Sequence, residues 1–92
     1  MNKNANNLLQ LQLKVLGDSS KLKILLLIKN QPKYNLEIAE ALSLSAATVS
    51  HHMSTLFNCF FVKFTKKNGK IYYELEKESM ENFITNFKNL WL

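Results

Sequence analysis

The chain has 92 residues, 47% of them hydrophobic, with one proline, two glycines and a net charge of +5. This length and composition predict one small, compact and mostly helical domain that buries about 60–65% of the surface that the unfolded chain exposes. No apolar run reaches the roughly 20 residues that span a bilayer, no secretion signal is recognisable, and a single cysteine excludes an internal disulfide. We therefore expect a soluble cytoplasmic protein. The charge allows contact with a polyanion, although a solvated basic surface would also explain it.

Two strongly apolar segments open the chain. A first helix is expected near residues 5–16 and a second near 19–30, with Asp18 or Ser19 as the N-cap of the second helix and Pro32 beyond its end. A surface helix with one buried face does not need so many apolar residues. Both helices are therefore expected to contact neighbours on several sides.

Two short helices follow. The third is expected near residues 35–42, with Asn35 as its cap, and the fourth near 45–57, with Ser45 as its cap. The inward face of the fourth helix carries one apolar residue per turn, namely Val49, Met53 and Leu56.

The hydrophobic period then changes to two over residues 62–75, on both sides of Asn68 and Gly69. This pattern is the strongest short-range signal of a β-hairpin. A last helix is expected near residues 78–91. Four helices, a hairpin and a helix predict a mainly α fold with a small β-hairpin wing, a winged helix-turn-helix, as one domain over 1–92.

The outward residues at the start of the fourth helix are small, neutral or positive, as a helix that enters the major groove requires. We assign contacts with base edges to Ser50 and His51, and contacts with phosphates to Thr48 and His52. No acidic residue occurs over 42–73. The alternative is a core helix with a polar outer face. The predicted DNA-binding residues are Ser45, Ala46, Ala47, Thr48, Ser50, His51 and His52 on the helix and Lys66, Lys67, Asn68 and Lys70 on the wing.

Four stretches carry a recognisable pattern, at residues 16–25, 36–42, 44–53 and 66–75, and its most specific part is Thr-Val-Ser-His-His from Thr48. In these stretches the chain resembles the arsenic-repressor-type (ArsR/SmtB) winged-helix regulators. The resemblance implies a bacterial homodimer whose recognition helix and wing bind double-stranded DNA and repress a nearby gene. Twofold symmetry then predicts an inverted-repeat operator.

The chain departs from the family pattern at several positions. Lys21 replaces a usual Arg, and Phe60 replaces the Gly that normally follows the recognition helix. Because Phe60 is unsuited to a positive φ, we expect Asn58 to adopt the left-handed cap. The wing carries lysines where arginine is common, and lysine binds phosphate as a point charge.

The metal ligands of the family have no counterpart here. The start of the third helix has no thiol, and the last helix offers Glu78 and Glu81 without His or Asp. No metal or other cofactor is expected, and no catalytic residues are recognisable, so we do not expect an enzyme. Cys59 is interpreted as a small buried hydrophobe, with redox pairing between subunits as the alternative.

The first and last helices hold more apolar surface than a monomer of this size buries, which predicts a homodimer interface. Core packing or a ligand pocket could also use the aromatic stripe of the last helix. A DNA-binding repressor is the leading hypothesis; a winged-helix protein-interaction module and a ligand- or redox-responsive sensor without metal are the alternatives. The predicted interface residues are Leu8, Leu9, Leu13, Met80, Phe83, Ile84, Phe87, Leu90 and Trp91.

Overall fold

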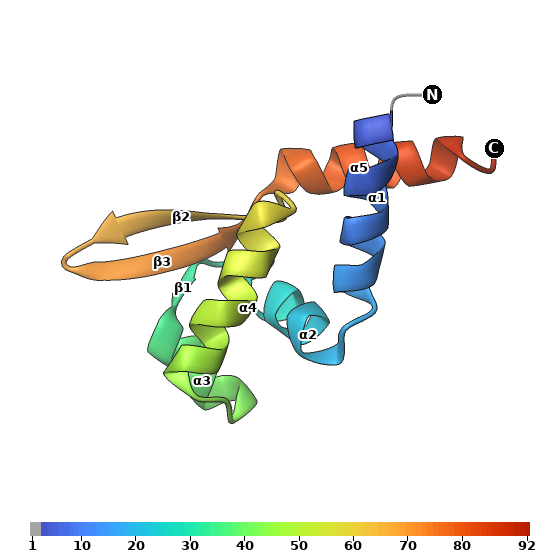
Figure 1. Cartoon of the computed structure of the whole chain (residues 1–92). Helices are drawn as coiled ribbons and strands as arrows, with labels where there is room; N and C mark the ends of the chain where they lie inside the picture. Colours follow the sequence, from blue (N-terminus) through green and yellow to red (C-terminus); the bar gives the residue numbers. More distant parts are fainter. Residues whose placement is uncertain (1–2) are drawn as a thin grey trace.

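The computed structural model describes residues 3–92, with side chains from Asn7 onward; Met1 and Asn2, at the start where no secretion signal was recognised, lie outside this range. The predicted order of helices, hairpin and helix is confirmed, with one additional short strand. The elements are α1 (Lys3–Leu16), α2 (Ser19–Ile28), β1 (Lys33–Tyr34), α3 (Asn35–Leu42), α4 (Ala46–Asn58), β2 (Val62–Lys67), β3 (Lys70–Leu75) and α5 (Lys77–Asn89) (Figure 1).

The elements divide the molecule into two ends. The hairpin of β2 and β3 extends away from the helices on one side, with α3 and α4 beside it, while α1 and α5 cross at the other end, where the C-terminus lies (Figure 1). None of the helices between residues 3 and 92 combines the length and the apolar character that crossing a bilayer requires.

The core lies between α2, α3 and α4. It is made of aliphatic side chains at helical spacing, each less than 10% exposed, and burial of one such side chain contributes about 1.5–3 kcal/mol. Phe61, fully buried after α4, packs edge-on against Phe83 of α5 with ring centroids 5.4 Å apart, which connects the last helix to this core. The main helical contributions are Ile24, Leu25 and Ile28 from α2, Ile38 and Ala39 from α3, and Val49, Met53 and Leu56 from α4.

The helix starts differ in how they are capped. Asp18 caps α2 as expected, because its carboxylate accepts a hydrogen bond of 3.0 Å from the backbone N–H of Lys21. The expected cap at Asn35 is wrong. Tyr34 precedes the first turn of α3, its backbone N–H donates to Glu37 at 3.0 Å, and Asn35 is already helical. The side chain of Asn35 is therefore free to make contacts elsewhere.

The strand β1 was not expected from the sequence. Lys33 pairs with Tyr73 and Tyr34 with Tyr72, which gives an antiparallel sheet in the order β1-β3-β2. A strand of two residues shows no alternation, so no periodic pattern could reveal it. It brings the start of α3 against the wing.

The end of α4 contradicts the expected cap at Asn58. Asn58 is helical, and Phe60 adopts the left-handed conformation with φ of 68°. The N–H of Phe60 donates to the carbonyl of Phe57 at 3.0 Å, and the N–H of Phe61 donates to the carbonyl of Leu56 at 3.1 Å. These two bonds form a Schellman motif, in which the buried pair of Leu56 and Phe61 holds a residue that lacks the freedom of glycine.

The wing turns where the sequence predicts it. Asn68 and Gly69 have φ of 52° and 76°, the two positive values that a type I′ turn requires. Lys67 pairs with Lys70 at the end of the hairpin. At its base, Lys63 lies 3.6 Å from the carboxylate of Glu74, so this lysine is neutralised locally.

Candidate nucleic-acid interface

The helix-turn-helix is formed by α3, a short turn and α4. Ser43 ends α3 in the left-handed conformation, with φ of 55°, and the N–H of Leu44 donates to the carbonyl of Ala39 at 2.9 Å. The next helix begins immediately after Ser45. Because Val49 and the other inward residues of α4 are buried, its opposite face is directed outward.

Ser45 acts within the protein as the N-cap of α4. Its hydroxyl oxygen accepts from the backbone N–H of Thr48 at 3.0 Å, and its O–H donates to the hydroxyl oxygen of Thr48 at 2.8 Å. Both hydrogen-bonding functions of Ser45 are thus used internally. The remaining hydroxyl hydrogen of Thr48 is the group that can reach a phosphate.

The predicted base-reading residues lie together on the exposed face of α4. Their side chains are small or polar, and they occupy the first two turns of the helix, which a major groove can accommodate. Thr48 and His52, the predicted phosphate contacts, lie at the edge of this face and are half-buried. The exposed residues of the face are Ala46, Ala47, Ser50 and His51.

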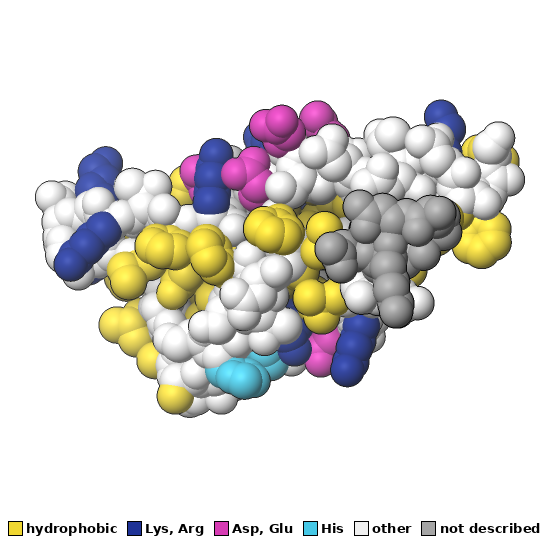
Figure 2. Space-filling model, turned by 45° about the horizontal axis from the view of Figure 1, so that its top comes forward, with side chains coloured by type: hydrophobic (Ala, Val, Ile, Leu, Met, Phe, Trp, Pro, Cys, Tyr) yellow, Lys and Arg dark blue, Asp and Glu magenta, His cyan; other side chains and the backbone are white. Residues whose placement is uncertain are grey.

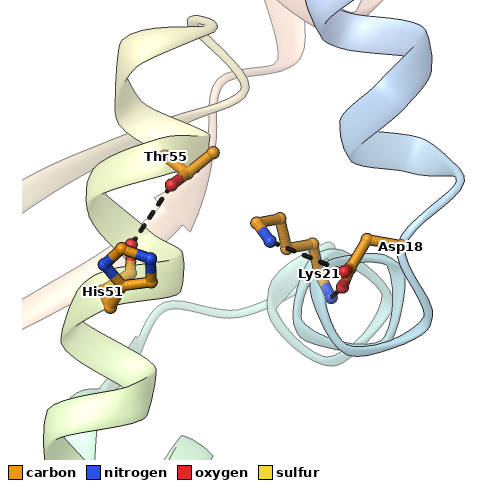
Figure 3. A network of polar contacts seen from close by, with 4 residues as sticks. All are labelled: Asp18, Lys21, His51 and Thr55. Atoms are coloured by element: carbon orange, nitrogen blue, oxygen red, sulfur yellow. Dashed lines mark hydrogen bonds and ion pairs between the residues drawn. The ribbon is translucent and has the colours of Figure 1, made fainter.

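His52 faces the start of α2 rather than open solvent. Burial lowers the pKa of this imidazole below 6.5, and the positive charge of Lys21 lowers it further, while Asp18 opposes the shift. Its Nδ1 is buried without a hydrogen-bond partner among the described residues. Lys21 extends toward α4 and lies 3.6 Å from the carboxylate of Asp18 (Figure 3).

His51 lies on the exposed side of the same helix. The hydroxyl of Thr55, one turn later, donates to the backbone carbonyl of His51 at 3.4 Å (Figure 3). The rings of His51 and His52 have centroids 6.2 Å apart at an angle of 49°, so the two side chains diverge as neighbours on a helix do. This divergence makes them a poor chelating pair.

The second part of the candidate interface is the wing. Lys66, Lys67, Asn68 and Lys70 are all exposed at the end of the hairpin, and lysine side chains protrude there in Figure 2. The amine of Lys70 lies 4.3 Å from the centroid of the Tyr34 ring, a cation–π contact that holds the start of β3 against β1. The acidic side chains visible in Figure 2 gather mainly near the start of α5, away from the histidines.

Asn35 is the residue of this surface that sequence reasoning missed. Its Nδ2 donates to the carbonyl of Ala46 at 3.2 Å and to the hydroxyl oxygen of Ser50 at 2.8 Å. The partners lie 11 and 15 positions along the chain, and no local pattern reports such a contact. An asparagine at the first turn of a helix is normally interpreted as a cap, which concealed this role.

The predicted interface residues of α1 and α5 form two groups. Leu8, Leu9 and Met80 are partly buried against the core of the same chain, and Phe83 is 8% exposed. The remaining predicted interface residues are not packed against the core of the described chain and are exposed. This exposed group is Leu13, Ile84, Phe87, Leu90 and Trp91.

Cys59 lies at the end of α4, where it is fully buried. Burial raises the pKa of its thiol, and the side chain of Gln12 from α1 donates to its backbone carbonyl at 3.0 Å. This environment matches the interpretation as a buried hydrophobe. Within residues 7–92, no group of three or more His, Cys, Asp or Glu side chains lies close enough to hold a metal ion.

Comparison with known proteins identifies relatives of this chain. Residues 18–63 match the family described as bacterial regulatory protein, arsR family. The chain is 34% identical over 74 residues to the arsenical resistance operon repressor of Staphylococcus aureus, a match that covers 80% of this chain and 71% of the relative.

Solved structures show the same fold. An ArsR-like transcriptional regulator from Rhodococcus sp. RHA1 has a TM-score of 0.86 at 17% identity, over 95% of this chain and 82% of that chain. The homodimeric winged helix-turn-helix DNA-binding domain of Mb0332 from Mycobacterium bovis has a TM-score of 0.78 at 18% identity, over 100% and 90% of the two chains. Both support the winged helix-turn-helix assignment.

Proposed function

Because this chain belongs to the ArsR family of bacterial regulatory proteins and is a winged helix-turn-helix DNA-binding transcriptional regulator, we propose that it acts as a homodimeric repressor at an inverted repeat in double-stranded DNA. The observation that carries the proposal is the exposed first half of α4, which offers small and polar side chains beside a wing tip with three lysines. In this proposal α4 enters the major groove and the wing follows the phosphate backbone.

Two observations support a homodimer. The exposed apolar side chains of α1, of α5 and of the residues just after α5 include Ile84 at 55% and Trp91 at 71% exposure, a costly arrangement for an isolated chain. The domain from Mycobacterium bovis is described as homodimeric. Repression follows by analogy with the Staphylococcus aureus relative, which is named as an operon repressor.

Symmetry sets the form of the operator. A twofold dimer places its two recognition helices about 34–36 Å apart, or a multiple of that distance, so the half-sites are about 10 bp apart or a multiple of it. Apolar contact between the alanines at the start of α4 and thymine methyl groups favours half-sites rich in A·T pairs.

We also propose that the regulator works without a metal and has no enzymatic activity, in the bacterial cytoplasm at the nucleoid. The family consists of transcriptional regulators, which are not enzymes. The start of α3 carries Tyr34, Asn35 and Leu36 in place of thiols. A zinc site needs three or four converging ligands, and neither the types of these side chains nor their arrangement favours one. The buried thiol of Cys59 disfavours the redox alternative.

The proposal is tested by selecting tight binders from a pool of random double-stranded DNA and measuring their affinity for the whole protein in rising salt. We expect an inverted repeat, two chains per duplex, and an affinity that Zn²⁺ leaves unchanged. Selection of a single unsymmetrical site would contradict the dimeric arrangement. Failure to retain any duplex above background, at low salt, would favour the protein-interaction module.

A further inference from the structure

The side chain of Asn35 makes the only direct side-chain hydrogen bonds between α3 and the outward face of α4 within residues 7–92. Its Nδ2 donates to the backbone carbonyl of Ala46 and to the hydroxyl oxygen of Ser50. A carbonyl can only accept, so the nitrogen of the amide, and not its oxygen, must face Ala46. The orientation of the amide is therefore determined by the backbone.

This orientation decides what the hydroxyl of Ser50 can do. The Ser50 oxygen accepts from Asn35 at 2.8 Å, so its hydrogen must point to another group. The internal acceptors open to a helical serine are the carbonyls three and four residues earlier. Here the nearer one belongs to Ala47, to which the hydroxyl of Ser50 makes no hydrogen bond in the described structure. The other belongs to Ala46, and it is already shared between the helical N–H of Ser50 and the amide of Asn35. Ser50 is exposed, and its hydroxyl hydrogen is left for a partner outside the chain.

The contact is not a requirement of the α3 start. Tyr34 and Glu37 already close the first turn of that helix. The other end of the amide, Oδ1, is buried without a partner among the described residues, which is unfavourable. The amide nitrogen thus donates two hydrogen bonds to α4, to Ala46 and to Ser50, while the amide oxygen stays unpaired within the described part of the chain.

We propose that Asn35 is a positioning residue that makes Ser50 a hydrogen-bond donor toward DNA, so that Ser50 selects a base-edge acceptor and rejects an amino group. This inference rests on the proposed function, in which α4 lies in the major groove. The acceptors there are O4 of thymine, O6 of guanine and N7 of either purine, whereas cytosine and adenine present amino groups at N4 and N6. Replacing T by C, or G by A, on the contacted strand turns an acceptor into a donor at nearly the same place.

The test uses the inverted repeat selected from random duplex DNA and the complete set of single base-pair changes in one half-site. For the whole protein we expect one position at which T over C, or G over A, is preferred by about 3- to 10-fold because of this single hydrogen bond. Ser50→Ala should abolish the preference at that position and leave the others intact. Ser54→Ala is the matched control, since Ser54 is an exposed serine one turn later on the same helix and is not among the hydrogen-bond partners of Asn35.

Two variants of Asn35 separate positioning from a structural role. In Asn35→Ala the hydroxyl can rotate, donate or accept, so the preference at the Ser50 position should fall to below about 2-fold. In Asn35→Asp the carboxylate cannot bond the carbonyl of Ala46 and turns away from it. It accepts the hydroxyl hydrogen of Ser50, which leaves the oxygen of Ser50 as an acceptor, so the preference should reverse toward C or A. The added negative charge weakens binding to all duplexes alike, and the ratio between duplexes is therefore the readout.

Circular dichroism and melting curves establish that each variant is folded. A role of Asn35 in stability alone would lower the affinity for all duplexes equally without changing their order, and this result would overturn the inference. An unchanged preference in Ser50→Ala would overturn it as well, while the selected inverted repeat would still support the proposed function. If the wild-type protein selects no duplex at all, the proposed function fails, and the inference fails with it.

Discussion

His52 is a histidine whose surroundings favour the neutral ring. It lies between α4 and the start of α2, half-buried, with Lys21 and Asp18 on one side and His51 as its neighbour. Burial lowers the pKa of the ring, and Lys21 acts in the same direction. A neutral His52 is a weaker phosphate ligand than the sequence suggested, although it still has one ring nitrogen with which to bond an oxygen.

The protein should lose stability on mild acidification because of His52. The folded-state pKa is lower than the ordinary value of 6.5, so the unfolded chain binds the proton more readily. The stabilisation is present above about pH 6.5 and is lost as the pH falls below it. We expect the Tm to decrease between about pH 7.5 and about pH 5.5, and to decrease less in His52→Gln.

His51→Gln is the control, because His51 is exposed on the other side of the helix. The hydrogen bond from the N–H of Lys21 lowers the pKa of Asp18 from 3.8. The stability that Asp18 contributes is therefore lost only at a pH below the range of this experiment. An equal decrease in Tm on acidification for the wild type and His52→Gln would show that protonation of His52 does not cause the loss of stability.

At the scale of elements, the end of α4 combines a favourable hydrogen-bond motif with an unfavourable residue. Phe60 has a positive φ, and the left-handed conformation costs a residue with a side chain about 1–2 kcal/mol. The buried neighbours Cys59 and Phe61 hold the chain there nonetheless. The ring of Phe60 is 58% exposed, so its removal would sacrifice little burial.

Phe60→Gly should therefore stabilise the protein by about 1 kcal/mol, which raises the Tm of a domain of this size by about 4–8 °C. Melting is compared at one protein concentration, because association also affects the Tm. Phe60→Ala is the matched control. It removes the same ring but keeps a Cβ at positive φ, so it should not stabilise. A stabilisation shared by both variants would point to the exposed ring and not to the backbone.

The wing carries three lysines at its tip and one at its base. Lys66, Lys67 and Lys70 are exposed, while Lys63 is paired with Glu74. If the tip follows the phosphate backbone, replacing its three lysines with alanine should weaken binding to all duplexes alike. The slope of log affinity against log salt should become shallower by about 0.9 for each phosphate that the variant no longer neutralises.

The control for the wing is Lys63→Ala, which removes one lysine charge from the base of the hairpin and should leave the slope nearly unchanged. Binding isotherms at several salt concentrations give both slopes. A triple variant with the wild-type salt dependence would place the wing tip away from the backbone.

At the scale of the whole molecule, α1 and α5, which carry exposed apolar side chains, cross at the end opposite the tip of the wing (Figure 1). Along α5, Phe83 stacks on Phe87 with centroids 6.0 Å apart, and Phe87 meets Trp91 at 6.1 Å. The stripe thus runs continuously from the core of one chain to its surface. A second copy that covers this surface would leave both copies of α4 free for DNA.

The double variant Ile84→Asp and Trp91→Asp should convert the protein to a monomer, because it places charges in a dry interface. Sedimentation at micromolar concentration should show the 10.7 kDa chain in place of a dimer. Leu36→Asp, an equally drastic change at a residue 60% exposed on α3, should leave the dimer intact. A wild-type protein that sediments as a monomer and still binds an inverted repeat tightly would refute the interface on α1 and α5.

The sequence by itself determined the order of elements and the face that α4 presents. Val49, Met53 and Leu56 recur at helical spacing, and Asn68 with Gly69 supports a tight hairpin turn. Both signals are contained in a few consecutive residues. The arsenic-repressor resemblance was visible for the same reason, since each of its four stretches, 16–25, 36–42, 44–53 and 66–75, is a short run of consecutive residues.

Only the tertiary structure decided the contacts between distant segments. The strand β1 exists because Tyr34 pairs with Tyr72. These two residues are separated in the sequence by α3, α4 and β2. Phe60 is left-handed because its neighbours are buried, against its own preference. Asn35 bonds Ser50 instead of capping its own helix. For β1 and Asn35 the energy comes from a partner that is distant in the chain, and for Phe60 it comes from the burial of its two neighbours in the core. A local pattern contains no information about either.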